Sequence, residues 1–146
     1  MILISHRGNL LGPNLNLENS PEYISDAIKS GYDVEVDFWV IDNLLYFGHD
    51  EPQYKIEKFF IDSYVKNLWL HCKNINALNY ILDKPKYYQG FWHENDKYTL
   101  TTNNYIWTYP NMPTTNRNII VHLGPLTNIK LDSVAGVCSD YIGLVK

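Results

Sequence analysis

The sequence predicts an α/β fold, a truncated TIM-type (β/α) barrel with several outer helices missing or reduced. Helical segments follow several apolar, strand-like segments, which begin near residues 2, 33, 68, 87, 105, 119 and 136. Strands that alternate with helices are typical of a parallel sheet. A complete barrel of this kind takes about 250 residues, whereas this chain has 146. We therefore expect a single domain, residues 1–146, whose missing helices lie chiefly after residue 85.

The first elements have clear boundary signals. Residues 2–5 begin with three apolar side chains and predict a short buried strand, and the loop after this strand is rich in Gly, Pro and Asn. Ser20 is a typical helix N-cap, Pro21 suits the first helical position, and Gly31 is a typical stop. A helix is therefore expected over residues 21–29.

The next strand, residues 33–40, alternates between apolar and acidic side chains. Val34 and Val36 face one side of the sheet, while Glu35 and Asp37 face the other. Because residues two apart on a strand share a face, these two carboxylates can converge on one cation.

A hairpin is expected after this strand. Residues 42–43 are a turn signal, and residues 44–47 form a second strand. The hairpin delivers His49 and Asp50 back to the same end of the sheet.

The rest of the chain contains shorter elements. Helices are predicted over residues 56–65 and 76–82, and strands over residues 67–73, 87–92, 105–109, 119–123 and 136–141. Where outer helices are missing, a second copy of the chain would cover the sheet, which predicts a homo-oligomer. The many Trp and Tyr residues between positions 87 and 109 suit such an interface.

Composition restricts the partners and the location. The net charge is −4 and Lys and Arg are not clustered, which argues against a nucleic-acid partner. The apolar N-terminus is too short for a signal peptide, and no segment approaches the roughly 18 apolar residues of a membrane span. Cys72 and Cys138 lie in apolar stretches and are expected to be free thiols. We expect a soluble, cytoplasmic protein.

Polar side chains gather at the ends of consecutive predicted strands. They are His6 and Arg7 after the first strand, Glu35 and Asp37 in the second, and His71 and Lys73 at the end of the third. His49 reaches the same end through the hairpin. In parallel barrels this end carries the functional site. Two imidazoles, an arginine and a pair of carboxylates are what metal-assisted cleavage of a phosphodiester needs.

In these stretches the chain resembles the glycerophosphodiester phosphodiesterase family, within the phospholipase-C-like phosphodiesterases. The matching stretches are SHRG, LENSPEY, DVEVDFWVIDNLLYFGHDEP, LHCK and, more weakly, GVCSDYI. The resemblance is dense from Ser5 to Pro52 and thin afterwards. It implies metal-dependent hydrolysis of a small-molecule phosphodiester, such as a glycerophosphodiester.

The resemblance also implies residue roles. His6 and His49 become the catalytic acid and base pair. Arg7 becomes a phosphate contact, because its planar guanidinium suits phosphate oxygens. Lys73 adds positive charge toward the phosphate.

Glu35 and Asp37 become metal ligands, and their hard oxygen atoms favour Mg²⁺ or Ca²⁺. The family usually has a glutamate two residues before the lysine, where this chain has His71. Either His71 binds the metal through a ring nitrogen or water takes that position. An imidazole ligand shifts the preference toward Mn²⁺ or Zn²⁺.

Other residues have supporting or open roles. The resemblance makes Glu18 a further carboxylate of the site and Asn19 a brace for the loop, while Asp50 either orients the preceding histidine or fixes its loop. His93 either faces the substrate or stabilises a loop. Asp140 either lines the site or makes a structural hydrogen bond.

Two alternative functions stay open. One is a binding module that keeps the phosphate-recognising residues but has lost turnover, which the short chain and His71 favour. Retention of both His6 and His49 speaks against it, because a binder needs no proton-transfer pair. The other is a phosphodiesterase in which a hydroxyl of the substrate attacks and yields a cyclic phosphate.

Overall fold

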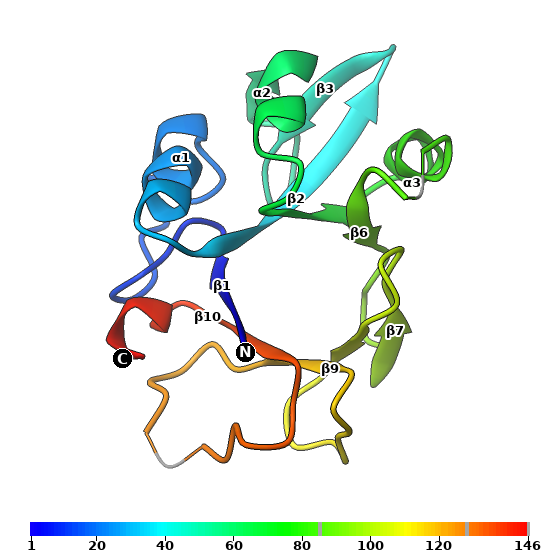
Figure 1. Ribbon diagram of the computed structural model, residues 1–146. Coiled ribbons are helices and arrows are strands. Elements are labelled where there is room, and N and C mark those ends of the chain that lie inside the picture. Colours follow the sequence, from blue (N-terminus) through cyan, green and yellow to red (C-terminus); the bar gives the residue numbers. More distant parts are fainter. Residues whose placement is uncertain (85, 128, 146) are drawn as a thin grey trace.

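The computed structural model describes residues 1–84, 86–127 and 129–145 (Figure 1). Its strands are β1 (Ile2–His6), β2 (Asp33–Ile41), β3 (Leu44–Phe47), β4 (Tyr54–Ile56), β5 (Leu68–Cys72), β6 (Gln89–Phe91), β7 (Tyr98–Leu100), β8 (Ile106–Thr108), β9 (Asn118–Val121) and β10 (Gly136–Ser139). Its helices are α1 (Pro21–Lys29), α2 (Lys58–Ser63), α3 (Ile75–Leu82) and the short 3₁₀ helix η1 (Ile142–Leu144).

All of these strands belong to one curled, mixed sheet. Its parallel part runs in the order β6-β5-β2-β1-β10-β9-β8. β3 and β4 extend the sheet from β2 as antiparallel strands, and β7 pairs antiparallel with β8. In Figure 1 the α-helices lie outside the curl around β2 and β6, and the side formed by β8, β9 and β10 carries loops in the part that the structure describes.

The predicted truncated (β/α) barrel is therefore wrong. The described residues form a curled mixed sheet with three short α-helices rather than alternating strands and helices. The connections give the physical reason, because parallel strands need a crossover of about a dozen residues or more. Residues 92–97 and 101–105, on either side of β7, are too short for one. The chain turns back there and forms an antiparallel pair instead.

The predicted helix over residues 21–29 is confirmed as α1. The Ser20 hydroxyl accepts a hydrogen bond from the backbone N–H of Tyr23 (3.4 Å), and Pro21 takes the first helical position. The helix predicted over residues 56–65 is shorter than expected, because residues 54–56 pair with β3 as the unpredicted strand β4 and α2 begins only at Lys58.

The sheet has a hydrophobic core on each of its faces. On the outer face, Val34, Val36 and Phe38 pack against residues of the three helices. The second core unites Ile4, Trp69, Phe91, Trp107, Ile119 and Cys138, which come from β1, β5, β6, β8, β9 and β10. Strands from all around the curl can share one core only on its concave side. The predicted alternation of residues 33–40 therefore directs Glu35 and Asp37 inward.

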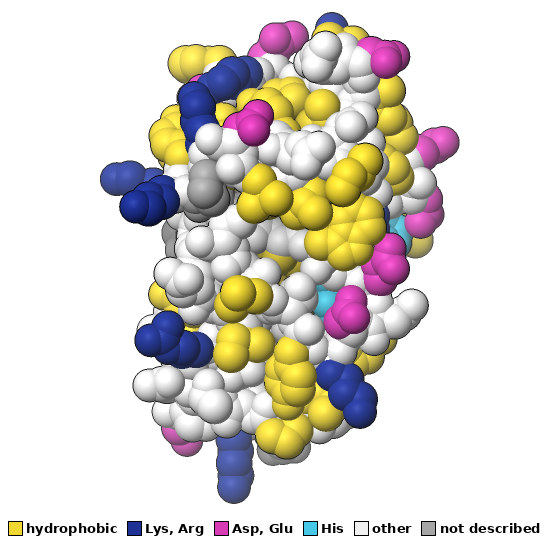
Figure 2. Space-filling model, turned by 90° about the vertical axis from the view of Figure 1, so that its right-hand side faces the viewer, with side chains coloured by type: hydrophobic (Ala, Val, Ile, Leu, Met, Phe, Trp, Pro, Cys, Tyr) yellow, Lys and Arg dark blue, Asp and Glu magenta, His cyan; other side chains and the backbone are white. Residues whose placement is uncertain are grey.

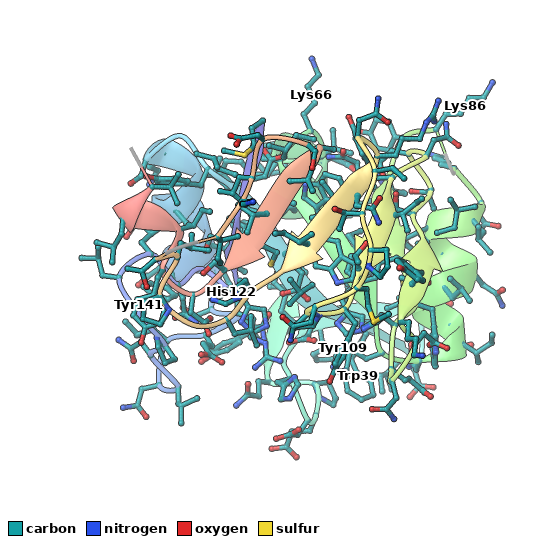
Figure 3. All side chains as sticks on the ribbon, turned by 90° about the horizontal axis from the view of Figure 1, so that it is seen from below. Trp39, Lys66, Lys86, Tyr109, His122 and Tyr141 are labelled. Atoms are coloured by element: carbon teal, nitrogen blue, oxygen red, sulfur yellow. The ribbon has the colours of Figure 1, made fainter. Side chains whose placement is uncertain are left out.

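The ends of the molecule differ in what they carry. In Figure 3 the arrowheads of the parallel strands point toward the end at which Trp39 and Tyr109 lie, and Lys66 and Lys86 extend from the opposite end. Any side chains placed just after parallel strands are thus gathered at the Trp39 end.

The surface keeps some apolar side chains uncovered. On the face that carries α3, β6 and β7, hydrophobic side chains are visible over a wide area (Figure 2), and Ile75, Tyr98 and Leu100 are exposed. The homo-oligomer expected from the sequence stays a prediction. Cys72 and Cys138 are buried free thiols, as expected. Of the helices in the described ranges, none combines the length and the apolar character that crossing a bilayer requires.

The packing of the outer core predicts how a substitution there changes the free energy of unfolding. Phe47 is fully buried and contacts the rings of Phe38 and Phe60 edge-on. Phe47→Ala should lower the free energy of unfolding by about 3–5 kcal/mol in urea denaturation, because it leaves a cavity. Phe59, which is 81% exposed on α2, provides the matched control. Phe59→Ala should change stability by less than about 0.5 kcal/mol, and equal losses in the two variants would contradict this description of the core.

Candidate functional site

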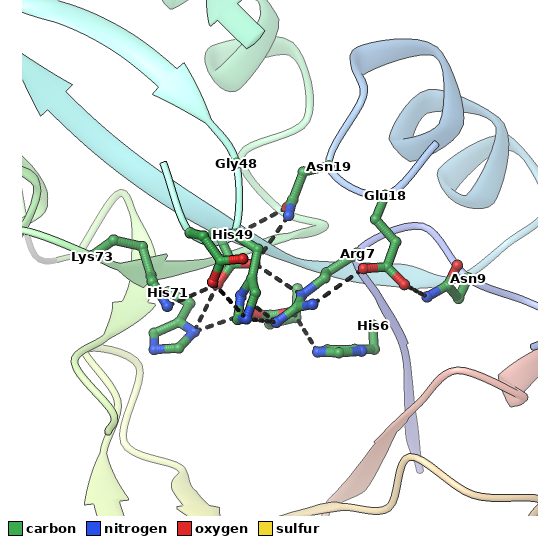
Figure 4. A network of polar contacts seen from close by, with 12 residues as sticks. His6, Arg7, Asn9, Glu18, Asn19, Gly48, His49, His71 and Lys73 are labelled. Carbon is green, nitrogen blue, oxygen red and sulfur yellow. Dashed lines mark hydrogen bonds and ion pairs between the residues drawn. The ribbon is translucent and has the colours of Figure 1, made fainter. Parts of the chain in front are cut away.

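The predicted site residues converge at one end of the sheet (Figure 4). β1 ends at His6, and Asp140 directly follows β10, its parallel neighbour. In the pairing of β1 with β2, His6 lies opposite Glu35, and in the pairing of β2 with β5, Asp37 lies opposite His71. The register of three adjacent strands therefore places two imidazoles beside the two carboxylates of β2.

Asp37 is the centre of this arrangement and is fully buried. Its Oδ2 lies 2.9 Å from Arg7 Nε and 3.3 Å from His49 Nδ1, and it accepts a hydrogen bond from Asn19 Nδ2 (3.0 Å). Burial alone would raise the pKa of Asp37, but its close contacts with the His49 and His71 rings and the charge of Arg7 outweigh burial and hold that pKa well below its ordinary value. Asp37 is therefore an anion held in place by cations and donors.

Glu35 and Asp37 share a third neighbour, His71. His71 Nδ1 lies 3.3 Å from Glu35 Oε1 and 3.2 Å from Asp37 Oδ1, and one donor atom from each of the three residues falls within 4.8 Å of the others. Lys73 Nζ lies 3.5 Å from Asp37 Oδ1. Among the residues that the structure describes, two buried carboxylate oxygens, Glu35 Oε2 and Asp37 Oδ1, make ion-pair contacts but no well-aligned hydrogen bond. Buried oxygens of this kind are suitable ligands for a cation.

Contacts on the side of the ring away from the carboxylates set the orientation of His71. Its Nε2 donates a hydrogen bond to the backbone carbonyl of His93 (2.7 Å), and its ring stacks on Phe91 with centroids 5.1 Å apart. A fixed Nε2–H directs Nδ1 toward the carboxylates, where it either carries a proton or binds a metal. Burial lowers the pKa of His71, but the two neighbouring carboxylates prevail and raise it to about 9. The His93 backbone carbonyl thus orients His71. The two roles expected for the His93 ring, facing the substrate or stabilising a loop, stay predictions.

His6 is held by Asp140. His6 Nδ1 donates to Asp140 Oδ1 (2.7 Å), so its Nε2 faces the site, 3.8 Å from Glu35 Oε2. Burial opposes a charge on His6, but the hydrogen bond to Asp140 and the charge of Glu35 raise its pKa above the ordinary value. Asp140 thus makes a hydrogen bond that orients the His6 ring, and this contact is compatible with both roles expected for Asp140.

His49 lies at the rim and is less buried than His6. Gly48 precedes it with φ 153°, and a Cβ there would approach Glu51 O to 2.1 Å, so the tight turn after β3 requires glycine. Arg7 Nη2 lies 2.5 Å from His49 Nδ1. Because arginine only donates, Nδ1 accepts from Arg7 in the tautomer that carries its proton on Nε2, and it can donate to Asp37 Oδ2 (3.3 Å) only when it is itself protonated. Asp50 is almost fully exposed, and its 3.5 Å contact with Nε2 is loose.

The Arg7 guanidinium contacts Asp37, His49 and Glu18 and so connects several parts of the site. It has a left-handed backbone conformation (φ 57°), followed by Gly8 (φ 96°), which turns the chain sharply after β1. Its Nη1 donates to Glu18 Oε2 (3.1 Å), and the other Glu18 oxygen accepts from Asn9 (2.8 Å). Sequence reasoning missed Asn9, because a single buried asparagine in a loop has no periodic or spacing signal.

The site opens into a cavity of about 280 Å³. Its lining consists of Arg7, Leu15, Glu18, Asn19, His49, Asp50, Glu51 and Gln53. A more apolar groove of about 390 Å³ lies along α2 and includes none of the site residues. The smaller, more polar cavity is therefore the one that a reacting group can share with Arg7 and His49.

Two further ring side chains, Trp107 and His122, lie apart from this network. Trp107 is buried in the inner core and stacks on Phe91 with centroids 4.3 Å apart. His122 Nε2 contacts the backbone carbonyl of Pro125 (3.3 Å). These contacts give Trp107 and His122 structural roles.

Comparisons of the chain with protein-family models, with curated proteins and with solved structures find no match. The geometry of the site is therefore what indicates a function for this chain.

The position of His71 predicts a pH-dependent stability. Its pKa rises on folding from an ordinary 6.5 to about 9, so its charged form stabilises the fold fully below pH 6.5, and this stabilisation is lost as the pH rises through 9. The loss is at most about 3 kcal/mol. Urea unfolding of the metal-free protein on both sides of this range should show the decrease in the wild type and a smaller one in His71→Gln. Equal decreases would contradict the assignment.

Proposed function

We propose that this protein is a metal-dependent phosphodiesterase that cleaves a small-molecule, glycerophosphodiester-like substrate by general acid/base catalysis. The observation that supports it is a single connected group of side chains. His6 Nε2 lies 3.8 Å from Glu35, His49 Nδ1 lies 3.3 Å from Asp37, and the Arg7 guanidinium bridges Asp37 and His49. Proton-transfer groups, a cation and candidate metal ligands thus form one connected cluster, of which Arg7 and His49 line the cavity.

The donor set fits a divalent cation. Glu35 and Asp37 each have a buried oxygen that makes no well-aligned hydrogen bond with the described part of the chain, and His71 Nδ1 faces both carboxylates. Two carboxylates suit Mg²⁺ or Ca²⁺, and the added imidazole favours Mn²⁺ or Zn²⁺. When bound, such a cation supplies charge neutralisation for the phosphate and for the alkoxide that leaves.

Arg7 and Lys73 supply fixed positive charge. Three of the five Arg7 N–H groups face Asp37, Glu18 and His49, and this leaves two for nonbridging phosphate oxygens. Lys73 Nζ, near Asp37, adds a second cation. Because Arg7 is locked by its protein partners, it can orient the phosphate with little loss of side-chain entropy on binding.

The two histidines have different surroundings, which suggests different roles. Asp140 holds the proton on His6 Nδ1 and leaves the Nε2 lone pair to accept a proton from the nucleophile, either water or a hydroxyl of the substrate. Asp140 also stabilises the imidazolium that results. His49 Nε2 lies at the cavity and can protonate the leaving alkoxide, and Asp37 Oδ2 can accept from Nδ1 when His49 is doubly protonated.

A phosphodiester-binding module without turnover is the second candidate. The many partners of Arg7 and Asp37 favour it, because their charges already balance each other without a ligand. The paired histidines argue for catalysis, since recognition of a phosphate alone needs no proton acceptor and donor. The two functions differ in a direct assay.

Turnover should depend on a metal. The wild-type protein should hydrolyse bis(p-nitrophenyl) phosphate, lose this activity in EDTA, and regain it with Mg²⁺, Ca²⁺, Mn²⁺ or Zn²⁺. Phosphorus NMR on a glycerophosphodiester distinguishes hydrolysis from formation of a cyclic phosphate. Activity that persists in EDTA after dialysis contradicts the metal requirement. Binding of the glycerophosphodiester without any cleavage supports the binding module.

Each of the two histidines should be essential. His6→Ala and His49→Ala should each lower kcat by about 10²–10⁴-fold, the usual contribution of a general acid or base. Melting curves should show that both variants remain folded. His122→Ala, which removes an imidazole outside the network, should retain wild-type kcat. If His6→Ala is folded and fully active, the role proposed for His6 is wrong.

A further inference from the structure

Asn9 is a fully buried polar residue in the turn that follows β1. Its backbone N–H donates to His6 O (2.9 Å), and its backbone carbonyl accepts from the Ser5 hydroxyl (2.9 Å). Its side-chain oxygen accepts from the backbone N–H of Asn14 (3.0 Å). These contacts fix the position of the asparagine. They also fix which end of the side-chain amide is oxygen and which is nitrogen, because Oδ1 faces a donor and Nδ2 faces acceptors.

The side-chain nitrogen of Asn9 contacts two carboxylates. It donates to Glu18 Oε1 and to Asp140 Oδ1, each at 2.8 Å. Glu18 in turn binds Arg7 Nη1, and Asp140 binds His6 Nδ1. Both carboxylates are largely buried. A continuous chain of contacts therefore leads from the guanidinium through one amide to the imidazole (Figure 4 shows its Arg7, Glu18, Asn9 and His6 members).

We propose that Asn9 is a positioning residue that couples the phosphate-contacting Arg7 to the proton-accepting His6. The inference rests on the proposed function for the roles of these two residues, but the coupling itself is a property of the contacts. Two buried carboxylates that approach the same nitrogen repel each other unless donors separate them. The two N–H groups of a primary amide satisfy both carboxylates at once.

The contacts of Asn9 suggest a substitution that removes the shared donor and changes little else. Asn9→Asp has nearly the same size and keeps the oxygen that accepts from Asn14, but it replaces the shared donor with a third carboxylate oxygen. Glu18 and Asp140 should then move apart, and Arg7 and His6 should move with them. Asn67→Asp is the matched control, because Asn67 Nδ2 donates to a carboxylate of Asp33 (3.0 Å) near the opposite end of β2.

Steady-state kinetics with bis(p-nitrophenyl) phosphate and added metal provide the first measurement. Asn9→Asp should lower kcat about 10- to 100-fold, because His6 is displaced, and should also raise KM, because Arg7 is displaced. A merely structural defect would lower kcat with the loss of folded protein and leave KM unchanged. Asn67→Asp should change neither constant. If Asn9→Asp is not recovered folded, the neutral variant Asn9→Ser is measured instead. Wild-type kcat and KM in the folded variant would overturn the proposal.

Nitrogen-15 NMR of the histidine rings provides a second measurement that needs no activity. The wild type should show His6 protonated at Nδ1, and Asn9→Asp should shift the His6 ring signals while Asn67→Asp leaves them unchanged. An unchanged His6 spectrum in the folded Asn9 variant overturns the coupling. A wild type without turnover, combined with a shifted His6 spectrum in the variant, would refute the phosphodiesterase while supporting the positioning role of Asn9.

Discussion

The buried carboxylate of Asp37 is the constraint on which the site depends. An ionised carboxylate inside a protein costs several kcal/mol unless cations and donors surround it. Arg7, Asn19, His49 and His71 meet this need, and they come from the turn after β1, the loop before α1, the hairpin and β5. One buried charge therefore fixes four separate segments of the chain. Loss of a single partner should disturb the others as well, because each shares the same two oxygen atoms.

The sheet makes this arrangement possible through its two faces. β2 buries Val36 on the outer face and carries Glu35 and Asp37 on the concave face, so the acidic pair stands directly above a hydrophobic core. This core limits access of water to the carboxylates and strengthens their interactions with neighbouring cations. The same enclosure leaves two carboxylate oxygens with ion-pair contacts but without a well-aligned hydrogen bond from the residues of known position. A fold that only needed stability would gain from satisfying them, which is why they favour a ligand-binding role.

Much of the site could be predicted from sequence, whereas the architecture could not. The order of His6, Arg7, Glu35, Asp37 and His49 identified a group that the structure brings together. Local signals also predicted α1, because its cap and its first proline lie within a few residues of each other. The prediction of a barrel was wrong because the spacing of strands along the sequence does not reveal whether neighbouring strands run parallel or antiparallel. β7 runs antiparallel to β8, and residues 54–56, of which only the last lies in the predicted helix, pair with β3 as β4, since pairing with a neighbouring strand outweighs local preference.

The sequence by itself determined which side chains share a face of β2 and which residues end the first strand, because these follow from local backbone geometry. Only the tertiary structure decided the partners of those side chains. The contacts of Asp140 with His6, of the His93 carbonyl with His71, and of Asn9 with two carboxylates all depend on packing between elements far apart in the chain. Hydrogen bonds require a match of a few tenths of an ångström, and no local pattern specifies distances between such remote segments.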